Sequence, residues 1–235
     1  MEQTLKITNV LADPTRYYIY QHIVNNHGDV SVQQIADSFN IHPNVARLHL
    51  SKLEDIDMLT SNARKTGKGG RPSRLYRLSD KVIQLHFPYR NYQLLSRIAI
   101  QTMMTLGEQG KQALYETGKA FGEELIKQQL ALALNSKSID RIGFAEKVSM
   151  LKNAATIAGL SPEIQASEEE NKIYFRIFNC PFKEVTEVEP GTICSIHNSF
   201  LEGMFEALFN NVNIVELENM MSNCAACSYQ ASVLT

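Results

Sequence analysis

Cysteine is scarce in this 235-residue chain, and the first 179 residues contain none. All of the cysteines lie in the last quarter, at Cys180, Cys194, Cys224 and Cys227. The sequence also lacks an apolar run of membrane-spanning length and an N-terminal apolar stretch with a small-residue cleavage site. We therefore expect a cytoplasmic protein without membrane contact, in which thiols stay reduced. In that compartment, clustered cysteines are more often metal ligands or redox groups than structural disulfides.

The motifs of common enzyme classes are missing as well. There is no glycine-rich phosphate loop, no nucleophile elbow and no recognisable Cys-His-Asn grouping. The Cys-x-x-Cys in "NCAACSY" (223–229) has no βαβ setting around it, which a thioredoxin-like redox motif would have. We therefore expect that the protein is not an enzyme. A thiol-dependent enzyme remains the alternative from another class.

Acidic residues are depleted in the front of the chain relative to the back. Residues 1–90 carry 12 Lys and Arg against 8 Asp and Glu, whereas residues 91–235 carry 11 against 17. A basic front and an acidic back suggest that any contact with nucleic acid is confined to the front.

Three helical segments are predicted in the first 55 residues, and the first of them is divided. The apolar pattern of 5–24 indicates a helix that "DPTR" divides in two, if Asp13 is an N-cap and Pro14 the first helical residue. A short helix is expected over 31–39, and Pro43 opens a third that runs to about residue 55. Two short helices joined by a tight turn are typical of a helix-turn-helix.

The third helix separates an apolar face from a polar one. Ala46, Leu50 and Leu53 fall at i, i+4 and i+7, so we expect them to face a core. The opposite face would enter the major groove, where Asn and Arg can read base edges while Ser and Lys hold phosphates. A solvated helix face is the alternative interpretation. The DNA-binding candidates on this face are Asn44, Arg47, Leu48, Ser51 and Lys52.

A basic hairpin is predicted directly after this helix. The stretch "ARKTGKGGRPSRLYRLS" (63–79) holds six basic and no acidic residues, with glycines at its centre and a strand-like run at its end. A hairpin behind a helix-turn-helix defines a winged helix, whose wing contacts phosphate or the minor groove. The candidates here are Arg64, Lys65, Lys68, Arg71 and Arg74.

These segments together resemble a known family. "LADPTRYYIYQHI", "VARLHLSKLEDIDML" and "GRPSRLYRLS" are similar to winged-helix regulators of the arsenic-repressor-like group, and within it to the Suf repressor, which controls iron–sulfur assembly genes in bacteria. Asp57 stands where such proteins usually have a glycine. The resemblance covers residues 1–80, and it implies a regulator that binds a double-stranded DNA operator.

The back half divides into long helices and a small mixed domain. Helices over 91–106 and 111–134 are expected to form the interface of a homodimer, with an intradomain helical hairpin as the alternative. Beyond them, the pattern predicts helix, two strands, helix and two strands, an α+β sensor domain. The expected fold class is therefore α+β, with a winged helix-turn-helix at 1–85, a helical linker and dimerisation region at 86–140, and a cysteine-containing sensor at 141–235.

The cysteine spacing leaves several kinds of site open. Thiolates bind soft metals and iron–sulfur clusters, and four could complete a Cys₄ site for Zn²⁺, [2Fe–2S] or [4Fe–4S]. We expect Cys180 at a strand end and Cys194 at a helix start, where a thiol pKa falls. The gaps of 13, 29 and 2 residues match neither a zinc ribbon nor a ferredoxin. A Cys224–Cys227 disulfide and plain buried thiols are the alternatives.

A second, looser resemblance covers 143–235. "NCPF", then a cysteine with His197 three residues later, then "C-x-Y" near the end, is similar to the sensor domain of Suf-repressor-like proteins. It implies that Cys180, Cys194 and Cys227 bind an iron–sulfur cluster. Cys224 is extra to that pattern, so the fourth ligand is Cys224, His197 or solvent. The resulting prediction is a transcription regulator, with repression as the expected sign, controlled by this cluster; a structural zinc or a thiol switch is the alternative.

Overall fold

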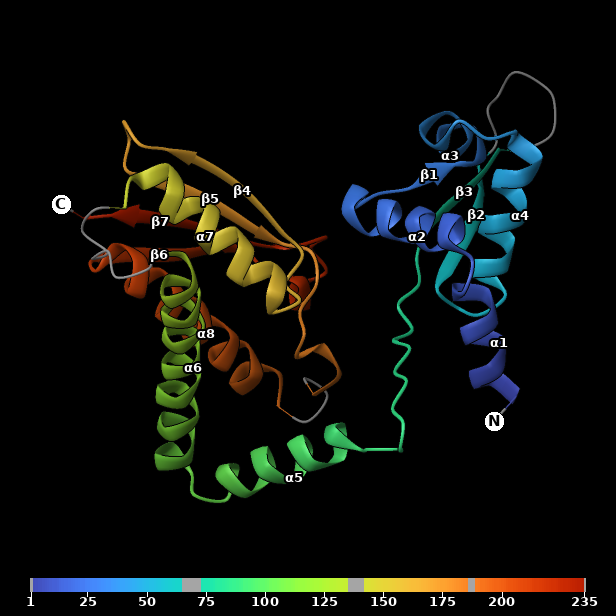
Figure 1. The fold of residues 1–235 in the computed structure, drawn as a ribbon. Coiled ribbons are helices and arrows are strands. Elements are labelled where there is room, and N and C mark those ends of the chain that lie inside the picture. The colour runs from blue at the N-terminus through green and yellow to red at the C-terminus, as the bar shows by residue number, and fades with distance from the viewer. Residues whose placement is uncertain (1, 65–72, 135–141, 186–188, 235) are drawn as a thin grey trace. The chain divides into compact units, whose positions relative to one another are not determined.

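The computed structural model describes residues 2–64, 73–134, 142–185 and 189–234. Its contacts divide into two compact units, Met1–Arg90 and Asn91–Thr235, which are described separately (Figure 1). The three-part division at residues 85 and 140 stays a prediction.

The N-terminal unit is built from four helices and a small sheet. The helices are α1 (Glu2–Leu11), α2 (Pro14–Asn26), α3 (Val32–Phe39) and α4 (Pro43–Glu54). The strands β1 (Val30–Ser31), β2 (Leu59–Arg64) and β3 (Ser73–Leu78) form an antiparallel sheet in the order β1-β3-β2. The predicted hairpin after α4 is therefore present, and β1 is a strand that sequence reasoning missed.

Local capping signals explain where these helices begin. The carboxylate of Asp13 accepts a hydrogen bond from the Arg16 amide at 3.0 Å, so α2 starts at Pro14 as predicted. Ser31 and Gln34 cap the start of α3 reciprocally, through a capping box. His42 accepts from the Asn44 amide at the start of α4. Each cap satisfies backbone donors that the first helical turn leaves without an acceptor.

One apolar core holds this unit together. The prediction that Ala46, Leu50 and Leu53 face inward is confirmed, because all three are fully buried. They pack with side chains of α1, α2, α3 and both longer strands, among them Ile19, Ile35 and Tyr76. The opposite face of α4 is therefore left to solvent.

The C-terminal unit combines four helices with a second sheet. The helices are α5 (Tyr92–Met104), α6 (Glu108–Leu134), α7 (Phe144–Ile157) and α8 (Pro190–Phe209), with short 3₁₀ helices η2 (Lys183–Val185) and η3 (Met220–Ser222). The strands β4 (Pro162–Ser167), β5 (Lys172–Ile177), β6 (Val212–Glu218) and β7 (Cys227–Val233) form an antiparallel sheet in the order β4-β5-β7-β6. Helices α6, α7 and α8 share one core with the inner face of this sheet (Figure 1).

Helix α6 packs along α8 at close range. A Cβ atom on Gly122 would clash with the carbonyl oxygen of Phe200, and one on Gly203 would clash with that of Lys119. Glycine at these positions lets the two backbones approach. Ile126 of α6 is fully buried in the core of the unit. Ile126 therefore packs within its own chain, and a homodimer interface over 111–134 stays a prediction.

Helix α5 differs from α6 because it buries none of its residues. Leu94, Leu95 and Ile98 are 52%, 62% and 54% exposed. An apolar helix surface of this kind is typical of a place where another chain binds. Within the described residues, no helix combines the length and apolarity needed to cross a membrane.

Candidate DNA-binding surface and thiol site

The outer face of α4 presents the predicted DNA-binding residues to solvent. Asn44, Arg47, Leu48 and Lys52 are exposed, and Leu48 has 55% of its surface accessible. Ser51 is half-buried. The Arg47 guanidinium donates to Asn44 Oδ1 at 3.3 Å, so these two side chains lie together near the start of the helix.

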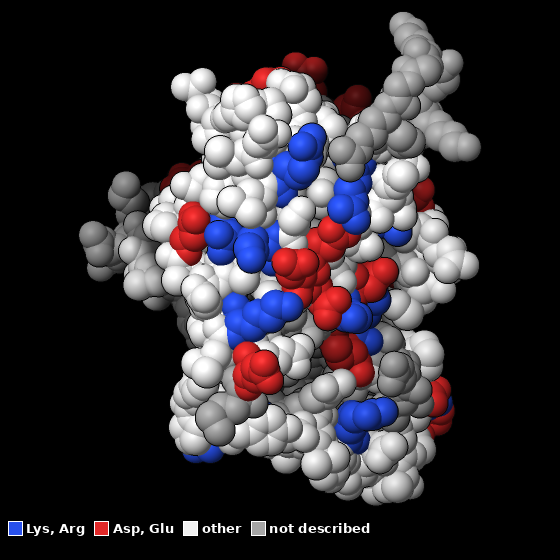
Figure 2. Space-filling view, turned by 90° about the vertical axis from the view of Figure 1, so that its right-hand side faces the viewer, with Lys and Arg blue, Asp and Glu red and all other residues white. Residues whose placement is uncertain are grey.

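Only part of the predicted wing lies among the described residues. Arg74 of β3 donates to Glu54 Oε1 at 3.4 Å, and its side chain is half-exposed. Lys65, Lys68 and Arg71 lie outside the described residues, and Arg64 is described only through its backbone in β2. Figure 2 shows Lys and Arg in several separate groups with Asp and Glu between them. The described basic side chains on this face therefore do not form one continuous field.

A buried histidine of α4, His49, lies close to the start of α2. His49 Nδ1 lies 3.9 Å from Asp13 Oδ2, and Arg16 donates to the Val10 carbonyl at 2.6 Å. Burial lowers the pKa of His49, although the Asp13 charge opposes that shift. The Arg16 amide, followed by the nearby positive groups, lowers the pKa of Asp13. His49 is 8% exposed, so it packs inside the N-terminal unit.

In the C-terminal unit, three of the four cysteines meet around one small cavity. Cys180 follows β5, Cys194 lies on α8, and Cys227 begins β7. His197, one turn beyond Cys194, lines the same cavity. The cavity has a volume of 10 Å³, about enough for one water molecule or ion. Asn198, Asn219, Met220 and Met221 complete the wall together with Ile193 and Tyr229.

Hydrogen bonds hold the cavity wall in place. Cys180 Sγ lies 3.9 Å from His197 Nδ1, and Cys227 Sγ accepts from the Met220 amide at 3.4 Å. His197 is 3% exposed, and its Nε2 has no hydrogen-bond partner among the described residues. A buried ring nitrogen without a partner is costly unless another group satisfies it.

Burial favours the protonated form of two thiols of this site, Cys180 and Cys227. The pKa of Cys180 is raised to about 11, mainly by burial and to a smaller extent by the nearby thiols of Cys227 and Cys194. Burial likewise raises the pKa of Cys227 and lowers that of His197 to about 4. A buried thiol with a raised pKa is a poor nucleophile. A bound cation would reverse this balance, because a coordinating thiol loses its proton.

One prediction about the cysteines needs correction, and one cysteine lies outside the cavity. Helix α8 begins at Pro190, so Cys194 lies a full turn inside the helix rather than at its start, and the argument from the helix terminus does not apply to it. Cys224 does not line the cavity, although Cys227 does. Its Sγ lies 4.0 Å from the Ser222 carbonyl, on the turn that follows η3.

A carboxylate beside the site was missed by sequence reasoning. Glu216 accepts hydrogen bonds at 3.0 Å from both Asn198 and Asn219, which line the cavity. Burial is the main cause of both pKa shifts at the site; the Glu216 charge adds to the rise at Cys227 and opposes the fall at His197. The bulge in β6 between residues 216 and 218 shifts the side chains there, and a single sequence carries no signal for it.

The donors fit a soft metal in kind, but their positions are not those of a loaded site. Three thiols and one imidazole on a shared cavity are the ligand types of zinc and iron–sulfur centres. Yet within the described ranges no three Cys, His, Asp or Glu side chains are arranged so as to hold a metal ion.

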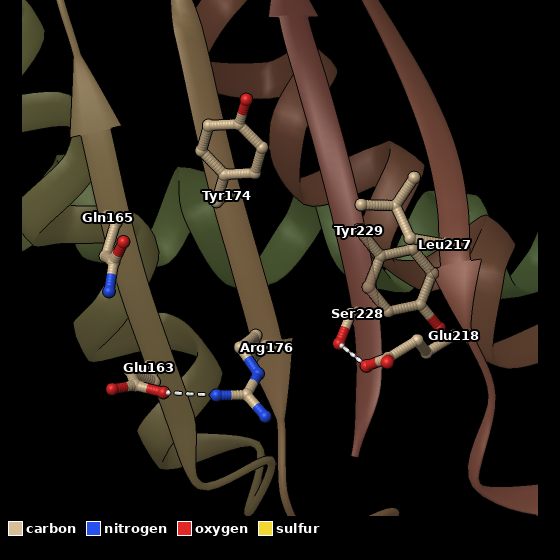
Figure 3. A pocket seen from close by; sticks show the side chains of 8 residues that line it. All are labelled: Glu163, Gln165, Tyr174, Arg176, Leu217, Glu218, Ser228 and Tyr229. Carbon is tan, nitrogen blue, oxygen red and sulfur yellow. Dashed lines mark hydrogen bonds and ion pairs between the residues drawn. The ribbon is translucent and has the colours of Figure 1, made fainter. Parts of the chain in front are cut away.

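A second hollow lies on the outer face of the C-terminal sheet. It has a volume of 570 Å³, and Tyr174 and Arg176 of β5 stand at its centre (Figure 3). Arg176 pairs with Glu163 at 3.2 Å, and Glu218 accepts from Ser228 at 2.8 Å. The charged groups of this hollow therefore already have partners within the sheet.

Comparison with known proteins defines the class of the N-terminal unit. Residues 11–62 match the model of a helix-turn-helix domain family. The match spans α2, α3 and α4, the elements that present the exposed residues described above. The chain therefore carries a helix-turn-helix domain, which points to a DNA-binding regulator.

Solved structures give weaker likenesses. One is a trafficking protein particle complex subunit 3 from Naegleria fowleri, covalently bound to palmitic acid, at 13% identity and a TM-score of 0.41, covering 61% of this chain and 97% of the other. Another is the phenol-responsive sensory domain of the transcription activator PoxR with phenol, at 16% identity and a TM-score of 0.42, covering 79% and 88%. A comparison with curated proteins gave no match.

Proposed function

We propose that the chain is a DNA-binding transcription regulator, a repressor of the winged-helix type, whose operator affinity depends on a metal centre held by Cys180, Cys194 and Cys227. The observation that carries the metal part is the convergence of these three thiols and His197 on one buried cavity. The helix-turn-helix match and the exposed face of α4 support the DNA-binding part.

Contacts of α5 provide a route from the thiol site toward the DNA-binding unit. Gln93, near the start of α5, donates to the Glu184 carbonyl at 3.4 Å, on the segment that follows Cys180. Met104, at the end of α5, accepts from the Thr192 hydroxyl at 3.6 Å, two residues before Cys194. Both ends of α5 are thus tied to cysteine-bearing segments. A change in metal occupancy would therefore act on the helix that follows the DNA-binding unit in the chain.

Two kinds of centre are candidates, each with its own support. The resemblance to Suf-repressor-like proteins favours an iron–sulfur cluster, and the 10 Å³ cavity favours a single Zn²⁺. Either would be held by the three thiolates, with His197 in position to provide the fourth ligand and Glu216 to orient the wall. When bound, the group supplies a positive centre that stabilises deprotonated thiols.

The test uses the full chain purified without oxygen. Iron, zinc and acid-labile sulfide are counted per chain, and affinity for operator DNA selected from random sequence is measured before and after removal of the metal. We expect a soft metal bound to the chain, and an affinity change between about 5- and 150-fold on its removal, the range of a coupling free energy of about 1–3 kcal/mol. A chain that contains no metal as isolated and takes up none would refute the metal part. A chain that selects no DNA sequence would refute the regulator part.

A thiol switch without metal is the remaining alternative. The specific observation in its favour is that Cys224 lies three residues from Cys227, and that all four cysteines are free. The burial of Cys227 and its raised pKa oppose it, because a thiol in that state reacts slowly. Titration of thiols in the metal-free chain after oxidation distinguishes the two: a disulfide between these residues would support the switch.

A further inference from the structure

A hollow in the N-terminal unit has the properties of an anion site. It lies where the starts of α3 and α4 meet β3, and it has a volume of 630 Å³. Two arginines line it, and none of its described lining residues is acidic. The lining residues are Ser31, Val32, Gln33, Pro43, Arg47, Ala63, Ser73, Arg74 and Tyr76.

The two arginines come from different elements, and each gives one hydrogen bond to the described part of the chain. Arg47 lies on α4 and gives one hydrogen bond to Asn44. Arg74 lies on β3, gives one to Glu54, and places its guanidinium 5.6 Å from the centre of the Tyr76 ring. A guanidinium carries five N–H donors, so within the described residues most donors of both remain available for a ligand.

Tyr76 adds an independent sign that the hollow takes a ligand. Its side chain is fully buried, and its hydroxyl has no hydrogen-bond partner among the described residues. A buried hydroxyl left without a partner costs free energy, and native proteins seldom keep one without a reason. An acceptor bound in the hollow that Tyr76 lines would supply the missing partner.

The start of α3 also favours an anion in the hollow. The capping box satisfies the amide of Gln34, whereas the amides of Val32 and Gln33 have no acceptor within the helix. Both residues line the hollow. The helix dipole places partial positive charge at this end, which favours an anion.

We infer that this hollow binds a backbone phosphate of double-stranded DNA, held by Arg47, Arg74 and the Tyr76 hydroxyl. The inference rests on the proposed DNA-binding function and makes it more specific. A DNA strand whose backbone passes over the start of α4 would place one of its phosphates in this hollow. Arg47, predicted from the sequence as a reader of bases, is assigned to the phosphate instead, so its contribution is independent of DNA sequence.

The test measures affinity of the full chain for DNA by fluorescence anisotropy over a series of salt concentrations. Two duplexes are used, one selected for tight binding and one of mixed sequence. The variants are Arg47→Ala, Arg74→Ala and Tyr76→Phe. Arg77→Ala is the matched control, because it removes the same charge from the same strand at a residue that does not line the hollow.

We expect Arg47→Ala and Arg74→Ala to lower the affinity for both duplexes by the same factor. In each variant, the slope of log affinity against log salt concentration should become shallower by about one, because one fewer counterion is released. Tyr76→Phe should weaken binding about tenfold at fixed salt with the same salt dependence, since it removes a hydrogen bond to a charged group and no charge. Its thermal stability should equal or exceed that of the wild type, because it removes a buried hydroxyl without a partner. Arg77→Ala should bind nearly as the wild type does.

Three results would overturn the inference while leaving DNA binding intact. In the first, Arg47→Ala and Arg74→Ala lose no more DNA affinity than Arg77→Ala does. In the second, these two variants lose affinity only for the selected duplex. In the third, Tyr76→Phe is stable and binds DNA as tightly as the wild type. A free anion is the other source of the same chemistry. If inorganic phosphate stabilises the wild type but not Arg47→Ala, while DNA affinity is equal in both, the hollow takes free phosphate and the inference fails. A wild type that binds no duplex would instead refute the proposed function.

Discussion

At the scale of single residues, the cysteines occupy two different positions relative to the thiol cavity, a difference that the sequence does not show. Cys180, Cys194 and Cys227 share a cavity with His197, whereas Cys224 lies on the turn beside it. Side chains on a common wall can converge on one ion after small movements, but a side chain outside the wall needs the turn to reorganise. The three cavity cysteines should therefore matter for metal binding in a way that Cys224 does not.

This difference predicts the metal content of four single variants. Replacing Cys180, Cys194 or Cys227 by Ser should lower the metal bound per chain to a small fraction of the wild-type value, whereas Cys224→Ser should keep it. Elemental analysis of anaerobically purified protein measures the outcome, and circular dichroism shows whether each variant is folded. Equal loss in all four would mean that Cys224 is a ligand.

His49 makes a second residue-scale prediction, about pH. Because burial lowers its pKa below the ordinary 6.5, the unfolded chain binds more protons than the folded one between the two pKa values. The contribution of His49 to the free energy of unfolding is therefore fully present above about pH 6.5 and is lost as pH falls, by at most about 1.4 kcal/mol per pH unit.

Comparison with His49→Gln isolates this contribution from that of other histidines. Urea unfolding at pH 7 and pH 5 should show a smaller loss of stability in the variant than in the wild type. An equal loss in both would show that His49 is not protonated differently in the folded and unfolded chains.

At the scale of elements, the pairing of α6 with α8 organises the C-terminal unit. Gly122 and Gly203 let the backbones approach, and Lys119 and Glu206 pair across the two helices at 2.7 Å. Helix α8 also carries Cys194 and His197, which line the thiol cavity, so α6 packs against the helix that forms one wall of that cavity. Stability and metal binding should therefore depend on the same helix contact.

The expected cost of disturbing this contact is testable with two alanine substitutions. Gly122→Ala should lower the free energy of unfolding by about 1–3 kcal/mol, because its Cβ meets the backbone of α8. Gly191→Ala on α8 is the matched control, since its Cβ would meet no atom within 4 Å. That substitution should raise stability by up to about 1 kcal/mol through helix propensity. Equal effects in chemical denaturation would contradict close packing at Gly122.

At the scale of the whole molecule, α5 presents an apolar surface on which Leu94, Leu95 and Ile98 stay more than half exposed among the described residues. We predict that a second copy of the chain binds there and forms the homodimer that a helix-turn-helix protein needs to contact two half-sites. Ile98→Lys should then give a monomer by analytical ultracentrifugation, with weaker binding to a two-site operator. Lys111→Glu, an exposed charge change on α6 that is not on this surface, serves as the control. A dimer that persists in Ile98→Lys would place the interface elsewhere.

The sequence by itself determined the local features of this protein. The helix cap at Asp13, the apolar positions of α4 and the order of elements in the mixed domain were all readable, because caps and periodicity are set by near neighbours. Tertiary structure alone decided the rest. The strand at Val30–Ser31 exists only through pairing with β3, and the cysteine cavity exists only because β5, α8 and β7 bring distant residues together. Such contacts depend on chain segments far apart in sequence, and residue spacing carries no record of them.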